Sequence, residues 1–294
     1  MKLLITGSNG LLGQKLVSYC QQHNTEFIAT SKGENRNSAC SEDVYTQMDI
    51  TDANQVMKVI SDNQPTHVIH TAAMTNVDQC ENDPEGCKAI NVTATENLVL
   101  ACNANGSHFQ LLSTDFVFDG EQGNYKEDDQ INPLSVYAKS KVDAEKIVTE
   151  KSSTDWSIVR TIIVYGKGEN LSKSNIILWA KAVLEKGEPL NIVDDQFRAP
   201  TWAEDLAAGC MAIAEQEATG VYHMCGPETM SIYELITRIA EHFKYETKQI
   251  SRISSTTLNQ AAKRPPKTGF DLTKSITTVG YNPHTLEETL DELF

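Results

Sequence analysis

The chain has 294 residues, of which 40% are hydrophobic, and its formal net charge is −15 at neutral pH. This length suits one large α/β unit or a large domain with a smaller lobe, and no apolar run reaches the length of a transmembrane helix. The negative charge opposes binding to nucleic acid and to anionic membranes, so we expect neither as a partner.

The first segment predicts a strand, a glycine-rich turn and a helix, in that order. Residues 2–6 are a short apolar run typical of a buried strand, and we expect this early strand to leave no room for a signal peptide. Gly7, Gly10 and Gly13 follow, and residues 14–20 continue with helical periodicity. This order is the context that a dinucleotide-binding turn requires.

The three glycines suit such a turn chemically. Gly7 would permit the tight turn, Gly10 would let the backbone approach a pyrophosphate, and Gly13 would let the helix pack closely. The free amides at the helix start would face the phosphates. The spacing G-x-x-G-x-x-G displaces one glycine from the commonest pattern, and simple turn chemistry is the alternative.

Residues 26–32 predict the second strand, whose end should lie near the adenosine ribose of the cofactor. An acid at this end would bind the 2′-hydroxyl of NAD, but the next acid along the chain is Glu34. Ser31 and Lys32, with Arg36 nearby, offer a hydroxyl and positive charge instead. The sequence therefore favours NADP(H), with NAD(H) as the alternative.

Further strands are predicted at residues 43–48, 67–70 and 108–112, and Pro84 is well placed to open a helix that reaches Cys102. Strands that alternate with helices imply an α/β fold, here a Rossmann-type doubly wound parallel sheet with helices on both faces. Such sheets bind ligands outside the carboxyl ends of their strands. The residues at those ends are mostly small or polar, and plain turns or caps are the alternative: Asp49-Ile50-Thr51-Asp52, Thr71-Ala72-Ala73 and Ser113-Thr114-Asp115.

Tyr137 and Lys141 are four residues apart, a spacing that places both side chains on one face of a helix. A phenol with a pKa near ~10 exchanges its proton poorly at neutral pH, and a cation one turn away favours the phenolate. We therefore expect Lys141 to lower the pKa of Tyr137 towards the range that suits proton transfer. A solvated tyrosine and lysine on an amphipathic helix is the alternative.

After residue 165 the alternation of strands and helices loosens. We expect a dinucleotide-binding domain over residues 1–165 and a smaller, mainly substrate-binding α/β lobe over residues 166–294, with some segments returning to the first domain. The basic loop Lys263–Lys267 would either bind a phosphate or order this lobe. The elements predicted here are strands at 190–193 and 220–224 and helices at 176–186, 203–216, 231–243 and 285–294.

The cysteines and histidines point to neither a disulfide framework nor a metal site. The seven cysteines are odd in number and contain no C-x-x-C pair, and we expect Cys80 and Cys87 to be packing thiols. The seven histidines are scattered, so no metal is predicted. Free thiols fit a reducing cytoplasm, which we take as the expected location.

Several motifs extend along nearly the whole chain, and the block Ser113-Thr114-Asp115-Phe116-Val117-Phe118-Asp119-Gly120 is the most specific of them. The others include Ile5-Thr6-Gly7-x-x-Gly10-x-x-Gly13, His70-Thr71-Ala72-Ala73, Tyr137-x-x-x-Lys141, Arg160-Thr161, Asp195 to Thr201 and Arg264-Pro265. With these motifs the chain resembles the extended short-chain dehydrogenases/reductases, and within that superfamily the dTDP-4-dehydrorhamnose reductase family.

This resemblance implies NADPH-dependent reduction of the 4-keto group of a nucleotide-activated deoxysugar, of the type that converts dTDP-4-dehydrorhamnose to dTDP-rhamnose. Tyr137 would donate the proton, Lys141 would hold the nicotinamide ribose, and Thr114 would hydrogen-bond the reacting oxygen. Asp115 matches an acid of the family that either does chemistry or caps a loop. Ser113 should point to the opposite face of the strand from Thr114.

The resemblance also implies two sets of contact residues. Those expected at the cofactor are Gly7, Asn9, Gly10, Leu11, Leu12, Ser31, Lys32, Asp49, Ile50, Thr71, Ala72, Ala73, Thr75, Tyr137 and Lys141. Those expected at the sugar nucleotide are Val77, Thr114, Ile163, Gln196, Arg198 and Thr201. A homodimer is a further hypothesis.

Departures from the family pattern lie mainly on the substrate side. Ile163 stands where a tryptophan is common, and Arg198 with Ala199 replaces the more usual Gly-Ser. Other extended-superfamily oxidoreductases and epimerases are alternatives, and a 4,6-dehydratase is disfavoured because Phe116 stands where it needs a glutamate. From a different class, the regulatory subunit of methionine adenosyltransferase is a relative that acts through a partner, and it too carries an arginine before the Pro-Thr pair.

Overall fold

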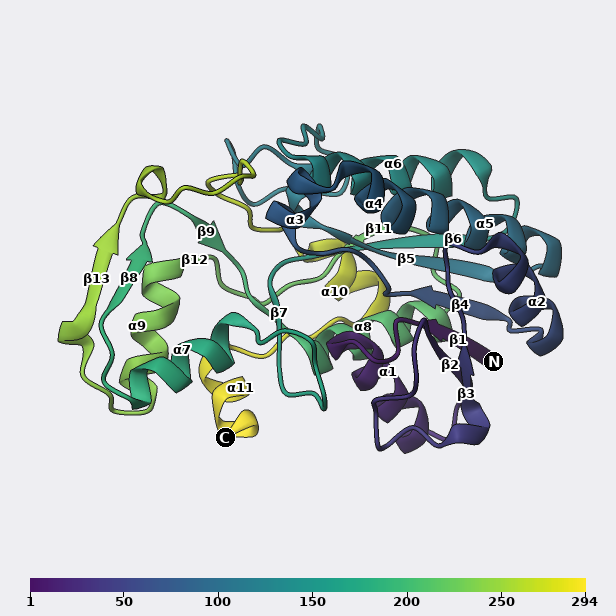
Figure 1. Cartoon of the computed structure of the whole chain (residues 1–294), viewed down its shortest axis with the longest axis horizontal. Helices are drawn as coiled ribbons and strands as arrows, with labels where there is room; N and C mark the ends of the chain where they lie inside the picture. Colours follow the sequence, from purple (N-terminus) through teal and green to yellow (C-terminus); the bar gives the residue numbers. More distant parts are fainter.

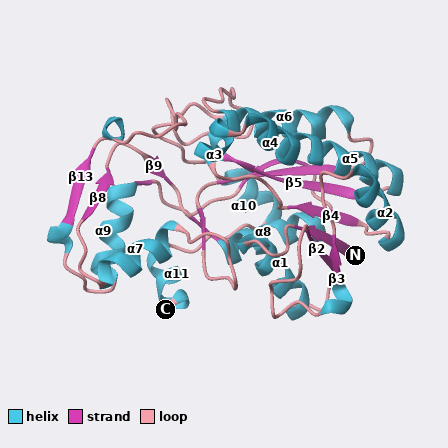
Figure 2. Ribbon diagram, viewed as in Figure 1, coloured by secondary structure: helices cyan, strands magenta, loops and turns pink.

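The computed structural model describes residues 1–294 and is built on a central parallel sheet (Figures 1 and 2). Its strands are β1 (Lys2–Thr6), β2 (Glu26–Ser31), β3 (Tyr45–Gln47), β4 (His67–His70), β5 (His108–Thr114), β6 (Trp156–Thr161) and β11 (Gly220–His223). They pair in the order β11-β6-β5-β4-β1-β2-β3, and every neighbouring pair is parallel. The order reverses between β1 and β4, where a doubly wound sheet opens a ligand crevice. The predicted fold class is confirmed.

Helices cover both faces of this sheet. Those on one face are α1 (Leu11–Gln22), α8 (Ala203–Glu215) and α10 (Thr273–Val279), and those on the other are α2 (Ala53–Asn63), α5 (Ala94–Asn105) and α6 (Val136–Lys151). Leu16 of α1 and Leu206 of α8 share one core, whereas Val56 of α2 and Leu98 of α5 share the other. Burial on both faces explains why the strands are continuous apolar runs instead of alternating ones.

Local sequence signals set the helix starts. Asp52 caps α2, because its carboxylate accepts hydrogen bonds from the backbone nitrogens of Asn54 at 2.9 Å and Gln55 at 3.2 Å. Pro84 opens α4 (Pro84–Lys88), which follows α3 (Val77–Asn82). A π-helical turn at Ala89–Thr93 then leads into α5, so the helix predicted from Pro84 to Cys102 is continuous but changes its winding.

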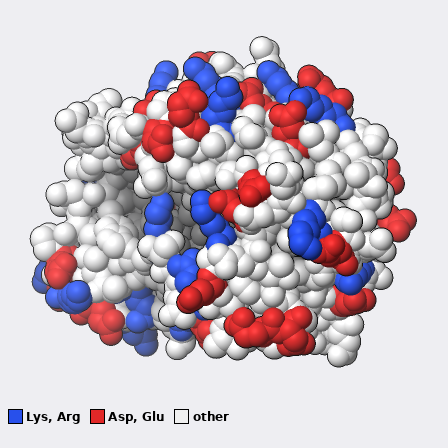
Figure 3. All heavy atoms as spheres, turned by 45° about the vertical axis from the view of Figure 1, so that its right-hand side comes forward, with Lys and Arg blue, Asp and Glu red and all other residues white.

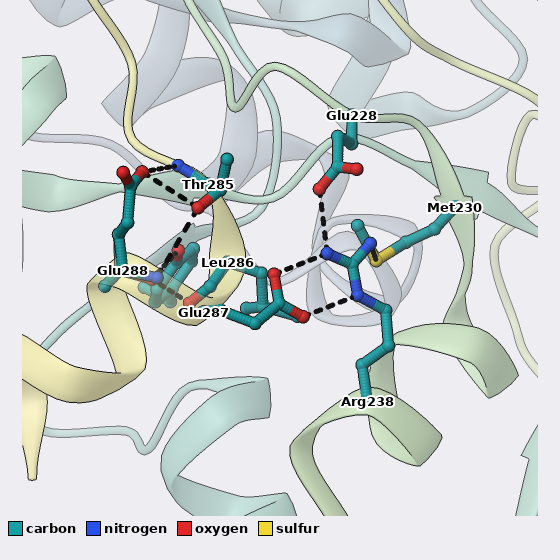
Figure 4. A network of polar contacts seen from close by, with 9 residues as sticks. Glu228, Met230, Arg238, Thr285, Leu286, Glu287 and Glu288 are labelled. Carbon is teal, nitrogen blue, oxygen red and sulfur yellow. Dashed lines mark hydrogen bonds and ion pairs between the residues drawn. The ribbon is translucent and has the colours of Figure 1, made fainter. Parts of the chain in front are cut away.

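The C-terminal lobe has its own small core, to which Ile177 and Leu290 belong. Its elements are α7 (Ile176–Glu185), β8 (Leu190–Val193), α9 (Ile232–His242), β13 (Ile250–Ile253) and α11 (Leu286–Leu293). Arg238 of α9 joins two segments: its guanidinium donates to the Glu287 carboxylate at 2.8 and 2.6 Å and to Glu228 at 2.8 Å (Figure 4). These bonds fix α11, at the end of the chain, to α9.

Two pairs of two-residue strands connect the lobe to the sheet. They are β7 (Val164–Tyr165) with β10 (Thr201–Trp202) and β9 (Phe197–Arg198) with β12 (Met230–Ser231). The sequence does not predict these pairs, since two residues carry no periodicity, and it also misses β6 and α10. β3 is shorter than the predicted strand 43–48 because residues 42–44 form a 3₁₀ turn. None of the helices combines the length and apolarity that a membrane span requires.

Candidate active site

A cavity of about 1070 Å³ lies at the carboxyl ends of β1, β2, β4 and β5. Every residue predicted to hold the cofactor lines it, together with Thr114, Asp115, Val77 and Ile163. On the face drawn in Figure 3 the surface is hollowed between the C-terminal lobe and the rest of the molecule, and Lys and Arg side chains gather at the rim of the hollow. Local positive charge is therefore available to an anionic ligand despite the acidic chain.

The glycine turn after β1 leaves no space for side chains. Gly7 has a φ of +69°, and a Cβ there would lie 2.8 Å from the backbone nitrogen of Ala72. A Cβ on Gly13 would lie 2.3 Å from the carbonyl oxygen of Gly7. Gly10 begins α1 without a side-chain cap, which leaves amides of the first helical turn free for a ligand. The positive end of the helix dipole favours an anion at this point, so the turn fits the pyrophosphate of a dinucleotide.

Two cationic side chains, Lys32 and Arg36, follow β2 and line the cavity, and only Lys32 has an ion-pair partner. Lys32 is largely exposed, and its Nζ lies 2.8 Å from the Asp49 carboxylate. Burial acts to raise the pKa of Asp49, but hydrogen bonds, chiefly from Lys32, outweigh it and the net shift is downward. Arg36 also lines the cavity and its guanidinium has no ion-pair partner, while its backbone nitrogen donates to Asn9 Oδ1 at 2.8 Å. Ser31 Oγ accepts from the backbone nitrogen of Asn9 at 3.2 Å.

Tyr137 and Lys141 lie on α6 and line the cavity from buried positions. Ser135 caps this helix by accepting from the backbone nitrogen of Ala138 at 3.2 Å. Burial raises the pKa of the Tyr137 phenol, and the Thr114 hydroxyl offsets the rise only in part. The predicted lowering of this pKa is therefore wrong, because desolvation is the larger effect. Burial lowers the pKa of Lys141 to about 8.

Thr114 and Asp115 follow one another at the end of β5, and both are buried. Thr114 Oγ1 donates to Asp115 Oδ1 at 3.0 Å and accepts from the backbone nitrogen of Phe116 at 3.3 Å. Arg198 Nε lies 3.7 Å from Asp115 Oδ2, and the Thr268 hydroxyl donates to the same oxygen. Burial raises the pKa of Asp115, while Arg198 and Thr268 act in the opposite direction.

Ser113 makes a different set of contacts from Thr114. Its Oγ donates to Glu145 at 2.5 Å, and the same carboxylate accepts two bonds from Arg160 at 3.0 and 2.8 Å. The hydroxyl of Ser113 is therefore committed to a buried ion pair on the α6 side of the sheet. This leaves Thr114 as the hydroxyl at the strand end that lies next to Tyr137.

The residues predicted at the sugar nucleotide divide into two groups. Val77 and Ile163 line the cavity, and Ile163 has a φ of +37°, a rare conformation for a β-branched residue. Gln196, Arg198 and Thr201 are not among the lining residues. Their contact with a substrate stays a prediction.

Internal contacts account for the positions of two of those three residues. Arg198 is buried, and its guanidinium donates to the carbonyl oxygens of Phe197 and Pro265, both at 2.7 Å. Thr201 is fully buried and donates to the carbonyl oxygen of Ile162 at 2.5 Å. Both side chains support the wall behind the cavity.

A loop from the C-terminal half, residues 166–172, closes on the N-terminal half beside the cavity. Gln14 donates to the Glu169 carbonyl oxygen and accepts from the Glu169 backbone nitrogen, both at 2.8 Å. The Glu169 carboxylate accepts from the backbone nitrogen of Ser38 at 2.9 Å, and Asn170 donates to the carbonyl oxygen of Arg36 at 3.1 Å. The sequence does not predict this contact, because its partners are more than a hundred positions apart.

Other lining residues were also outside the predicted set. They include Ile90, Phe116, Thr161, Val164, Ser172 and Leu206. Phe116 and Thr161 belong to family motifs, which is the one local indication that could have found them. The remaining four depend on how distant helices and loops pack.

The basic loop Lys263–Lys267 has a structural partner. Arg264 donates to both carboxylate oxygens of Asp78 at 2.7 and 3.2 Å, and the hydrogen bond from Arg264 lowers the pKa of that carboxyl. Arg264 does not line the cavity, so this loop orders the lobe against α3. The chain has no group of three or more His, Cys, Asp or Glu side chains arranged to hold a metal ion, and all seven cysteines are buried free thiols.

Comparison with known proteins gives one consistent family. The model of the RmlD substrate binding domain matches residues 1–294. A dTDP-4-dehydrorhamnose reductase from Clostridium acetobutylicum superposes with a TM-score of 0.88 at 29% identity, covering 100% of this chain and 98% of that one. A dTDP-4-dehydrorhamnose reductase from Bacillus anthracis, solved in complex with NADP, gives a TM-score of 0.86 at 26% identity with the same coverage. Methionine adenosyltransferase 2 subunit beta from Pongo abelii is 31% identical over 289 residues, which are 97% of this chain and 84% of that protein.

Proposed function

This chain belongs to the RmlD substrate binding domain family, and from that membership we propose that it is an NADPH-dependent oxidoreductase that reduces the 4-keto group of a nucleotide-activated deoxysugar. The substrate would be of the dTDP-4-dehydrorhamnose type, in keeping with the two similar reductases. NADP(H) is preferred and NAD(H) is possible. We further propose the division into a dinucleotide-binding domain at 1–165 and a mainly substrate-binding lobe at 166–294, a homodimer, and a cytoplasmic location.

One observation carries the proposal: Thr114, Tyr137 and Lys141 line the same cavity as the glycine turn. A phosphate-binding turn alone would support binding of any dinucleotide. A buried phenol with a hydroxyl and an ammonium beside it adds the groups that a carbonyl reduction needs. The cavity is also large enough for a dinucleotide and part of a second ligand.

Each residue has a separate role in the proposed reaction. NADPH, when bound, supplies the hydride. Tyr137 donates its phenol proton to the keto oxygen, and its raised pKa keeps that proton in place until negative charge develops on the oxygen. Lys141 stays mostly protonated at neutral pH and stabilises the resulting phenolate. The amides of the Gly7–Gly13 turn hold the pyrophosphate.

The first test is NADPH consumption with dTDP-4-dehydrorhamnose, followed by the near-ultraviolet absorbance of the cofactor, with NADH in parallel. We expect rapid oxidation of NADPH by the wild type. Tyr137→Phe should remove turnover and leave NADPH affinity near normal, since only the proton donor is lost. A Tyr137→Phe variant that retained most of its kcat would refute the proton-donor role.

A cofactor-binding regulatory subunit is the second candidate. It is favoured by the 31% identity to methionine adenosyltransferase 2 subunit beta and by Arg198 in the segment before Pro200 and Thr201. Cofactor binding seen by fluorescence without any NADPH oxidation would favour it over the reductase. Another extended-superfamily oxidoreductase or an epimerase would instead turn over a different sugar nucleotide, and Ile163 would be the first residue to question.

A further inference from the structure

The two carboxyl oxygens of Asp115 have different partners. Oδ2 accepts from the Thr268 hydroxyl and lies 3.7 Å from Arg198 Nε. Oδ1 accepts from Thr114 Oγ1 at 3.0 Å. The residue is only 3% exposed, so these three groups determine how the carboxyl is oriented.

The partners on the Oδ2 side are themselves held in place. Thr268 is fully buried, and Arg198 is 3% exposed with its two terminal guanidinium nitrogens bonded to backbone carbonyls. The Arg198 guanidinium lies 5.5 Å from the centre of the Phe116 ring, which packs edge to face on Tyr137 with 6.0 Å between the ring centroids. Donors from β9 and from the loop before α10 are therefore fixed on one side of the carboxyl, and Thr114 lies on the other.

This asymmetry determines which way the Thr114 hydroxyl points. An ionised carboxylate can only accept, so Thr114 must then donate to Asp115 and presents only lone pairs to the cavity. If Asp115 is protonated, the proton lies on Oδ1, because Oδ2 already faces two donors. Asp115 then donates to Thr114 Oγ1, and the Thr114 O–H is free to point into the cavity.

We propose that Asp115 is a positioning residue that sets whether Thr114 offers a hydrogen-bond donor or an acceptor to the reacting oxygen, and that Arg198 and Thr268 hold it in that role. The inference rests on the proposed reduction for its kinetic consequence. A keto oxygen is an acceptor, so reduction is favoured when Asp115 is protonated and Thr114 donates beside Tyr137. No covalent bond changes at Asp115 or Thr114, and the proton delivered to the product is that of Tyr137.

The groups around Asp115 fix the direction of the expected pH dependence. Arg198 faces it from β9, Tyr137 from α6, and the Cys225 thiol from the segment after β11, while Arg264 acts on Arg198. Burial raises the pKa of Asp115 despite Arg198, so the protonated form persists above the usual range of an aspartic acid. The kcat for reduction should therefore fall as the pH rises through this pKa.

Asp115→Asn provides the kinetic test. The amide oxygen would face Arg198 and Thr268, which places the amide nitrogen against Thr114 as a permanent donor. We expect Asp115→Asn to keep its kcat and to lose the fall in kcat that follows the pKa of Asp115, whereas Asp115→Ala should lower kcat about 10²-fold below that pKa. Asp128→Asn, at an exposed site away from the cavity, should keep the wild-type profile. Equal losses in Asp115→Asn and Asp115→Ala would overturn the inference, as would a pH profile of kcat in Asp115→Asn that coincides with that of the wild type.

A second measurement needs no substrate. The Asp115 carboxyl would be titrated by NMR in protein labelled at the aspartate carboxyl carbons, with Asp115→Asn to assign its signal. Thr114→Val removes a donor to the carboxylate, so we expect it to raise the pKa of Asp115. An unchanged pKa in Thr114→Val would overturn the inference. A shifted pKa in a protein that oxidises no NADPH would contradict the proposed function and leave the orientation of Thr114 by Asp115 standing.

Discussion

Among the single residues of the cavity, Tyr137 and Lys141 have pKa values that are shifted mainly by burial. Burial raises the pKa of the phenol and lowers that of the ammonium to about 8, so both disfavour their charged forms. In the proposed reaction, proton donation by Tyr137 would create an anion beside a cation one helical turn away. Lys141 would therefore stabilise the charge that develops during proton transfer more than it affects the resting phenol.

The pKa of Lys141 predicts an alkaline limb in the kinetics. Below pH 8 the ammonium is charged, and above it the charge is lost, so kcat/KM for reduction should fall with rising pH by about tenfold per unit. Lys141→Arg keeps its charge at high pH and should abolish this limb, even if its overall rate is lower. The measurement is the pH dependence of kcat/KM, with Lys139→Arg on the exposed side of α6 as the control. A limb that persists in Lys141→Arg would belong to another group.

Arg36 and Lys32 should differ in their effect on cofactor choice. Lys32 pairs with Asp49, whereas the guanidinium of Arg36 has no ion-pair partner and can bind a 2′-phosphate without losing one. We expect Arg36→Ala to weaken NADPH binding about 10- to 100-fold, which corresponds to one charged hydrogen-bonding contact, and to leave NADH nearly unchanged. Lys32→Ala should act in the same direction with a smaller effect. Fluorescence titrations with both cofactors test this, and equal losses for NADPH and NADH would refute a 2′-phosphate site here.

At the scale of elements, hydrogen bonds join the loop 166–172 to α1 beside the cavity. Gln14 of α1 makes reciprocal hydrogen bonds with the backbone of Glu169, and the Glu169 carboxylate binds the chain after β2. Segments from both halves of the chain must therefore separate for this side of the cavity to open. Release of a bound cofactor should depend on the strength of these bonds.

Gln14→Met tests this contact between α1 and the loop 166–172, since it keeps the side-chain length and removes both bonds to Glu169. We expect the dissociation rate of NADPH to rise about tenfold, because these two hydrogen bonds are lost together with the bond that Gln14 donates to the carbonyl oxygen of Asn9 at 3.1 Å. Stopped-flow fluorescence would measure the rate. Gln22→Met, an exposed change on the same helix, should leave it unchanged. An unaltered rate in Gln14→Met would mean that the loop opens independently of these bonds.

Across the whole molecule, the C-terminal lobe has its own core, whereas α8, β11 and α10 from the same half of the chain pack into the core around the sheet. The sheet domain supplies the glycine turn, β5 and α6, while the C-terminal half supplies Arg198 and Thr268 behind Asp115. Arg264 ties the lobe to Asp78 near the cavity, and Arg238 ties α9 to α11 far from it. A substitution that destabilises the lobe far from the cavity should therefore leave cofactor binding unchanged.

Arg238→Met tests whether lobe stability and cofactor binding are independent. It removes the pairs with Glu287 and Glu228, whose carboxylates are partly exposed, so we expect a loss of only about 1 kcal/mol in the free energy of unfolding and a fall in Tm of roughly 2–4 °C. NADPH affinity should stay at the wild-type value. Thermal unfolding and a fluorescence titration check the two parts, with Arg252→Met as an exposed control. A clear loss of NADPH affinity would show that the lobe core and the cavity are coupled.

Much of this architecture follows from local sequence. The glycine turn, the helix that begins at Pro84 and the Asp52 cap are predicted because each depends on residues within one turn of chain. The two-residue strands are not, because they form only when distant segments meet. The sequence predicts a lowered pKa for Tyr137, whereas the structure raises it. The reason is related, since burial depends on every residue packed around the phenol.

The sequence by itself determined the class of fold, the family and a group of residues that line one cavity, because strand periodicity, glycine turns and short motifs are local. The tertiary structure alone decided which cation is left without an ion-pair partner, which oxygen of Asp115 faces Thr114, and that Arg198 lies behind the cavity wall and not on it. These depend on contacts between segments that are far apart in the chain. Hydrogen-bond direction and desolvation are set by those contacts, and no local pattern encodes them.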